Sequence, residues 1–210
     1  VLEKEFAGFG ASGRNGGWLT GGFAWNHDRY ARTHGPLAVR AMVDAMSGTV
    51  AEVLHVARRE QIDADILPTD ELMVATAPAQ LARLEAEVSH RRSWGEEGRV
   101  RSITAAEVAA RIAIPGVLGG MIVSGVARVQ PAKLARGLAL AAERAGARIH
   151  EGTEVLSYAP GEVRTTQGTV RAPVILRATE GFTATLPGHR RDWLPLNSAQ
   201  TDLVRKQIID

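Results

Sequence analysis

The chain has 210 residues and a formal net charge of +2, and 45% of its residues are hydrophobic. This length and apolar content allow a buried core in one or two domains, and the arginines are spread along the chain without the long basic block that marks nucleic-acid binding. Cysteine is absent, which excludes disulfides and cysteine-bound zinc, and no apolar run reaches the roughly 18 residues of a membrane span.

An acidic residue ends a short apolar run at the start of the sequence. In dinucleotide-binding folds, an acidic side chain at the end of the second strand binds a ribose 2′-hydroxyl, and Glu3 follows Val1 and Leu2 in this way. The phosphate-binding glycines of such folds lie upstream, so the G-x-G-x-x-G motif falls outside this chain. Glu3 is therefore a candidate ribose ligand for either FAD or NAD(P).

A glycine-rich segment follows. Five of the ten residues from Gly8 to Gly17 are glycine. Glycine costs roughly 0.5–1 kcal/mol relative to alanine in regular structure, so this run indicates a close backbone approach or a positive φ. Ser12, Arg14 and Asn15 add a hydroxyl, a guanidinium and an amide, which suit a ligand with phosphates and sugar hydroxyls. A plain surface turn or a flexible linker is the alternative interpretation.

Helical periodicity dominates the middle of the chain. Apolar residues recur at three- and four-residue steps from Leu37 to Ala57, which predicts a long amphipathic helix that ends near Asp63, with Met42 and Met46 as core residues. Pro and capping signals predict the remaining elements: a strand over 71–75, a second helix after Pro78, a short helix opened by a capping box at Thr104 and Glu107 with Val108 and Ile112 inward, and a helix from Pro131 to Gly146.

The last third of the sequence changes its period. Short apolar segments around Val155, Val163 and Val170 are separated by Pro160-Gly161 and Gln167-Gly168, which predicts a small antiparallel meander. A continuous apolar run at Val174–Leu176 then predicts a strand that is buried on both faces of a parallel sheet. The six histidines are isolated in sequence, so no metal site is predicted, and the lack of a signal-peptide pattern favours a cytoplasmic protein.

Five sequence blocks in order carry a resemblance to a known family. They are Gly10–Gly17 with its Ser-Gly-Arg-Asn-Gly-Gly string, Ala132–Leu138, Gly146–Val155, Ala178–Thr183 and Leu186–Gly188. In these blocks the chain resembles FAD-dependent amine and amino-acid oxidoreductases of the D-amino-acid oxidase type, in particular the γ-glutamylputrescine oxidase branch. That family is longer, so the resemblance implies an internal fragment, without the first strand and phosphate loop, that is inactive alone.

The resemblance implies an α/β fold (α+β overall), a partial Rossmann-like FAD-binding domain with part of a mixed-sheet substrate domain. The implied domains are residues 1–68 (FAD-binding), 69–130 (substrate), 131–188 (return to the FAD-binding domain, with the meander) and 189–210 (start of a second substrate segment). Val155 would lie at the adenine and the turn after Leu176 near the phosphates. The implied FAD-binding residues are Glu3, Ser12, Gly13, Arg14, Asn15, Gly16, Gly17, Val155, Ala178, Thr179 and Gly181.

The implied reaction is oxidation of a primary or secondary amine, in an amino acid or polyamine derivative, to an imine, with oxygen as acceptor and hydrogen peroxide as product. No catalytic residue is assigned, because the flavin accepts the hydride equivalent and the protein binds, orients and desolvates the pair. Trp18 stands where the resembling proteins often have glutamine, and Arg128 is either a carboxylate ligand or an exposed arginine before a helix. An NAD(P)-dependent dehydrogenase and a non-catalytic remnant domain remain alternatives.

Overall fold

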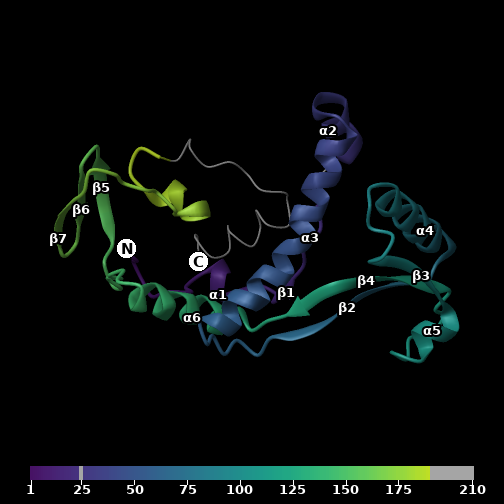
Figure 1. Ribbon diagram of the computed structural model, residues 1–210. Coiled ribbons are helices and arrows are strands. Elements are labelled where there is room, and N and C mark those ends of the chain that lie inside the picture. The colour runs from purple at the N-terminus through teal and green to yellow at the C-terminus, as the bar shows by residue number, and fades with distance from the viewer. Residues whose placement is uncertain (24–25, 190–210) are drawn as a thin grey trace. The chain divides into compact units, whose positions relative to one another are not determined.

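The computed structural model describes residues 1–23 and 26–189 (Figure 1). Their contacts divide the chain into two compact units. The first unit combines Val1–Asn15 with the chain from Pro131 onward, and the second unit is Gly16–Gln130. Residues 16–68 therefore pack with residues 69–130, whereas the sequence-based division placed them with residues 1–15. The assignment of each segment to cofactor or substrate stays a prediction.

The second unit is built on an antiparallel sheet in which β4 is central. β4 pairs with β2 along one edge and with β3 and β1 along the other. The strands are β1 (Trp18–Leu19), β2 (Leu67–Ala75), β3 (Val100–Thr104) and β4 (Gly119–Arg128). β2 begins before the predicted start at Glu71, and β4 lies in a stretch for which the sequence pattern predicts no strand.

Helices pack on both faces of this sheet (Figure 1). On one face, Met121 and Val123 of β4 pack with Val88 of α4, and on the other face Ile122 packs with Val108 of α5. This alternation follows from the period of two along a strand. The helices of the unit are α2 (His27–His34), α3 (Pro36–Arg59), α4 (Pro78–Ser93) and α5 (Ala105–Ala109).

The long predicted helix is present as α3, with two corrections. It ends at Arg59 rather than near Asp63, because Gln61 adopts a left-handed conformation (φ 55°) that an α-helix cannot continue through. Its buried face consists of Val39, Val43, Val50 and Ala57. Met42 is half-exposed instead of a core residue, because Val43 occupies the inward position beside it.

Ile112, also predicted to face inward, is 46% exposed because α5 ends at Ala109.

The first unit contains short elements around one longer helix. They are α1 (Ala11–Arg14), α6 (Pro131–Arg144), β5 (Val155–Ala159), β6 (Glu162–Thr165), β7 (Gly168–Arg171) and the 3₁₀-helix η1 (Glu180–Thr185). β5, β6 and β7 form the predicted antiparallel meander. At the N-terminus, Leu2 forms a parallel bridge with His150, so Val1–Glu3 lies in extended conformation beside the segment that leads into β5.

The predicted buried strand at Val174–Leu176 is absent. The segment pairs with no described strand, and Val174 and Leu176 are 79% and 87% exposed. A parallel strand is buried only where other strands flank it and helices cover both faces. In the first unit the only parallel pairing among residues 1–15 and 131–189 is the Leu2–His150 bridge, which does not reach this run.

Candidate cofactor site

The glycine-rich segment of the first unit folds tightly against its own neighbours. Gly10 has φ 72°, and a Cβ there would lie 3.0 Å from the Phe182 ring. A Cβ on Gly13 would lie 2.1 Å from the carbonyl oxygen of Gly8, a contact that no side chain tolerates. The close backbone approach predicted from composition is therefore present. Its partners, however, are other parts of the protein.

Aromatic rings hold this segment in place. The Phe9 ring lies 5.5 Å from Phe6 in edge-to-face geometry and 6.3 Å from Phe182 of η1, centroid to centroid. The Arg14 guanidinium lies 4.9 Å from the centre of the Phe9 ring, within cation–π range. Because Phe182 belongs to the η1 segment, this cluster brings the glycine-rich segment beside the predicted cofactor residue Gly181.

The polar residues of the segment are exposed. Ser12 and Arg14 lie on the exposed side of α1, and within residues 1–23 and 26–189 neither forms an ion pair or a side-chain hydrogen bond. Asn15 ends α1, and its amide nitrogen donates to the carbonyl oxygens of Ala11 at 3.1 Å and Ser12 at 3.3 Å. Ser12 and Arg14 thus have donor groups available to a ligand, whereas the Asn15 amide also caps its helix.

The last two glycines of the string belong to the second unit. Gly16 is exposed, and a Cβ there would meet the Trp18 indole at an ordinary 3.7 Å. Gly17 is buried with φ 71°, and its carbonyl oxygen accepts a hydrogen bond from the Val129 N–H at 2.9 Å. Gly17 is therefore needed for its backbone conformation at the start of β1, while Gly16 leaves open space around its backbone.

Glu3 lies beside the strand segment that precedes Val155. Its backbone N–H donates to the carbonyl oxygen of His150, and its own carbonyl oxygen accepts from the N–H of Thr153, at 2.9 and 2.8 Å. The Glu3 carboxylate accepts one hydrogen bond, from the N–H of Glu5 at 2.9 Å. Val155 is half-buried at the start of β5 and pairs with Thr165. The structure thus brings Glu3 close to the segment of Val155.

The Ala178–Gly181 turn enters η1. Ala178 is exposed, and the Thr179 hydroxyl hydrogen-bonds the Thr183 hydroxyl at 2.7 Å. Glu180 has φ 41°, and its carboxylate accepts the N–H of the buried Gly181. The Gly181 N–H is therefore satisfied within the turn. Phe182 was not among the predicted site residues, yet its ring contacts Gly10 and so fixes this turn to the glycine-rich segment. The sequence could have indicated Phe182, because it lies inside the Ala178–Thr183 block that carries the family resemblance.

Trp18 and Arg128 lie opposite each other at the end of the second unit's sheet. They are direct partners in the β1–β4 register. Both side chains are exposed, as is Leu67, which pairs with Arg128 from β2. The sequence pattern predicts no strand in the Gly125–Pro131 stretch, so this pairing is visible only in the structure.

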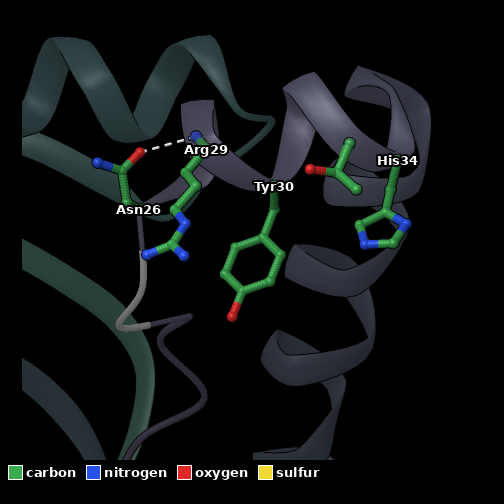
Figure 2. A pocket seen from close by; sticks show the side chains of 5 residues that line it. Asn26, Arg29, Tyr30 and His34 are labelled. Atoms are coloured by element: carbon green, nitrogen blue, oxygen red, sulfur yellow. Dashed lines mark hydrogen bonds between the residues drawn. The ribbon is translucent and has the colours of Figure 1, made fainter.

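The second unit also contains a pocket, and none of the predicted cofactor residues lines it. Figure 2 shows a pocket along α2, where the Asn26 side chain accepts the N–H of Arg29 at 2.8 Å and caps the helix; Tyr30, Thr33 and His34 complete its lining. In the described ranges, no group of three or more histidine or acidic side chains is placed to hold a metal ion. None of the helices in that part of the chain is long and apolar enough to cross a membrane.

Known proteins are similar to this chain along most of its length. Gamma-glutamylputrescine oxidoreductase of Escherichia coli (strain K12) is 30% identical over 186 residues, which cover 87% of this chain and 43% of that protein. Glycine oxidase from Geobacillus kaustophilus superposes with a TM-score of 0.68 at 27% identity, over 91% of this chain and 51% of that one. L-Amino acid deaminase from Proteus myxofaciens has the same fold, with a TM-score of 0.71 at 16% identity, over 93% of this chain and 43% of its own.

The chain thus spans about half the length of the relatives that it matches. The mixed α/β architecture agrees with the fold expected from the sequence. The sequence profile of the FAD dependent oxidoreductase family matches residues 1–209. The chain therefore belongs to the FAD dependent oxidoreductase family, whose cofactor is FAD.

Proposed function

We propose that the protein containing this chain oxidises a primary or secondary amine, in an amino acid or a polyamine derivative, to an imine. The electrons pass to oxygen, which gives hydrogen peroxide. The observation that carries the proposal is the packing of the glycine-rich segment on η1, because it gathers predicted cofactor residues from both ends of the first unit. The names of the relatives, an amine oxidoreductase and a glycine oxidase, support an amine or amino acid as substrate.

The exposed side chains of the segment fit the chemistry of FAD. A guanidinium binds phosphate oxygens through charge-assisted hydrogen bonds, and a hydroxyl binds either phosphate or ribitol oxygens. Arg14 and Ser12 have these groups on the exposed side of α1, with no competing carboxylate among the described residues. We assign Arg14 to a phosphate or another anionic group of FAD, and Ser12 to a neighbouring oxygen.

The reaction needs little acid–base chemistry from the protein. Bound flavin supplies the acceptor for the hydride equivalent. The amine must be neutral to give up that hydride, and a desolvated pocket favours the neutral form by lowering the amine pKa. The substrate loses two electrons and two protons as the C=N bond forms, and oxygen takes up both to form hydrogen peroxide. Water then hydrolyses the imine outside the chemical step.

Two other functions remain to be tested against this one. An NAD(P)-dependent dehydrogenase would also use Glu3 on a ribose, but the match to an FAD-dependent family argues against it. A non-catalytic domain would keep the fold without the cofactor. A cytoplasmic location also stays a prediction. The cofactor that the purified protein binds distinguishes amine oxidation from these two other functions.

The test uses the full-length gene product. We expect a yellow protein whose flavin absorbance is released on denaturation, and a screen of amines that yields peroxide in air and none without oxygen. A colourless protein that binds NADH would exclude the proposal. Peroxide-free turnover with an artificial acceptor would retain amine oxidation and exclude oxygen as acceptor.

Variants then test the role of Arg14. We expect Arg14→Gln to raise the Kd for FAD about tenfold or more, since it removes a charge-assisted contact. Phe9→Leu is the matched control, because it removes the ring beneath Arg14 and leaves the guanidinium. If both variants weaken FAD binding equally, Arg14 acts through packing, and its assignment to an anionic group is wrong.

A further inference from the structure

The sulfur atoms of this chain belong to four methionines, because the chain contains no cysteine. These methionines differ widely in burial. Met121 of β4 is 0% exposed, and Met73 of β2 is half-buried and packs against the same core cluster. On α3, Met46 is half-buried, whereas Met42 is 49% exposed. Met42 is therefore the most accessible methionine of the chain.

The neighbours of Met42 on α3 leave its side chain uncovered. On an α-helix, the side chains nearest to a residue are those three and four positions away. Two of these positions hold alanines, Ala38 and Ala45, and both are exposed. Each ends at a methyl group and is too short to cover a thioether. A third such position holds Val39, which is turned into the core and is 3% exposed.

An exposed thioether reacts with hydrogen peroxide, and the susceptibility of a methionine follows its exposure. The sulfur lone pair attacks one peroxide oxygen, an S–O bond forms and the O–O bond breaks. The proton of the transferred hydroxyl passes to the departing hydroxide, which leaves as water. Sulfur loses two electrons and peroxide gains them, so the reaction needs no further oxidant or reductant. The product is methionine sulfoxide.

The fold tolerates this product at Met42 better than at Met121. Oxidation converts an apolar thioether into a polar sulfoxide. On the exposed side of α3, water hydrates the new oxygen. The side chains around Met121 are apolar, namely Val88, Val100 and Val123. A polar group in that cluster is costly, because burial removes its hydration.

We propose that Met42 is the first residue of this chain to be oxidised by the hydrogen peroxide of the protein's own reaction. This inference rests on the proposed function, because amine oxidation with oxygen as acceptor supplies the peroxide. Hydrogen peroxide is small and uncharged, and it reaches the surface of α3 through solution. The exposed thioether reacts before the buried ones, and a methionine sulfoxide reductase returns the product to methionine.

Added hydrogen peroxide tests the site without turnover. The full-length protein is incubated with peroxide and digested, and mass spectrometry follows the sulfoxide at each methionine over time. We expect Met42 to react about tenfold or more faster than Met121, with Met46 and Met73 between them, because a buried thioether reacts only after local opening. In the urea-unfolded protein, the four should react at similar rates. Equal rates in the folded protein, or a faster reaction at another of the four, would overturn the inference.

Two leucine variants identify the reacting sulfur. Met42→Leu keeps the volume and the helix propensity and removes the thioether. The folded variant should lose the fastest mass increase of one oxygen atom. Met73→Leu is the matched control and should retain it. Retention of that fastest step in Met42→Leu would place the reactive group elsewhere and overturn the inference.

Two glutamine variants test whether α3 tolerates a polar group at this position. Met42→Gln places a polar amide where the sulfoxide forms, and the Tm measured by circular dichroism should match that of the wild type. Met121→Gln should lower the Tm, because the amide is buried among apolar side chains. An equal loss in both variants would show that oxidation at Met42 damages the fold, contrary to the inference.

Turnover connects the site with the proposed function. Once the peroxide released from an amine substrate reaches the concentration that oxidises Met42 when added, the sulfoxide should form there, and catalase should prevent it. Peroxide at that concentration without sulfoxide at Met42 would overturn the inference and keep amine oxidation. Turnover without peroxide would instead exclude oxygen as acceptor in the proposed function, while the rates with added peroxide would still decide whether Met42 is the most reactive methionine.

Discussion

The Arg91 guanidinium donates two hydrogen bonds to the two oxygens of the Glu96 carboxylate, each 2.7 Å long, inside the second unit. Glu96 is 4% exposed, and Arg99 adds a third contact at 3.2 Å. Burial alone would raise the pKa of the Glu96 carboxyl, but the hydrogen bonds and charge of Arg91 outweigh it and hold the pKa below its ordinary value. The pair links the end of α4 to the approach to β3.

Glu96→Gln should destabilise the protein strongly. The substitution removes the carboxylate that forms both hydrogen-bonded contacts with the Arg91 guanidinium, and breaking a buried pair in this way costs about 3–5 kcal/mol. Urea denaturation measures the free energy of unfolding. Glu97→Gln, at the exposed neighbouring position, removes the same charge and should change that free energy by no more than about 0.5 kcal/mol. Similar losses in the two variants would show that the buried pair is not the cause.

Replacement of glycine by alanine should have opposite effects on stability at Gly13 and at Gly48. Gly13→Ala places a methyl group 2.1 Å from the Gly8 carbonyl oxygen, so the backbone must shift, and we expect a loss of about 1–3 kcal/mol with a lower flavin content. Gly48→Ala, inside α3 with nothing within 4 Å of the new methyl group, should stabilise the protein by up to about 1 kcal/mol. Thermal unfolding and flavin absorbance measure both. Stabilisation by Gly13→Ala would contradict the tight packing of the segment.

Elements with local signals could be predicted from the sequence. α3, α4 and α6 each begin with a proline at the first helical turn, and apolar residues recur along the first two. The capping box is confirmed, because the Thr104 hydroxyl accepts the Glu107 N–H at 3.2 Å and the Glu107 carboxylate accepts the Thr104 N–H at 2.8 Å. These contacts join residues three positions apart, so the sequence alone contains both partners.

Features that depend on distant partners could not be predicted. β4 contains several glycines, and a Cβ on Gly120 would lie 2.4 Å from the Met73 carbonyl oxygen, a constraint set by β2. The same holds at Gly10, where the composition indicated close approach but the contacting ring belongs to Phe182. The prediction of a buried strand at Val174–Leu176 was wrong for the converse reason. Three consecutive apolar residues do not indicate which strands, if any, flank them. The cofactor residues themselves were placed by family resemblance, and their roles stay predictions.

The His27 cluster should make stability depend on pH. His27 is 7% exposed, its Nδ1 lies 3.4 Å from the Nε2 of His90, and its ring stacks on Trp94. Burial, followed by the charge of His90, lowers the pKa of His27 below the ordinary 6.5, although Glu96, Glu87 and Asp28 oppose the shift. The unfolded chain therefore binds this proton more readily than the folded chain does.

The direction in which stability changes with pH follows from that difference in proton binding. Stability is complete above about pH 6.5 and falls as the pH drops below it towards the folded pKa, by at most about 1.4 kcal/mol per pH unit for one proton. His27→Phe fills a similar volume and cannot titrate, so its free energy of unfolding should fall less between pH values of about 7.5 and about 5.5. His55→Gln, at an exposed position on α3, should retain the wild-type dependence. An equal fall in the wild type and in His27→Phe would assign the effect to other groups.

The last prediction concerns the pKa of a single carboxyl group, that of Glu107. Hydrogen bonding from the Thr104 backbone N–H, followed by that from the Arg101 guanidinium, lowers the pKa of Glu107 from the ordinary 4.5 to about 2. A carboxyl with a lowered pKa contributes stability that is present above pH 4.5 and is lost as the pH falls towards 2. NMR titration of the side-chain carboxyl carbon measures this pKa directly. In Arg101→Gln the pKa should rise but stay below 4.5, because the backbone donor remains. A pKa that returns fully to 4.5 in that variant would mean that Arg101, and not the helix cap, holds the proton off Glu107.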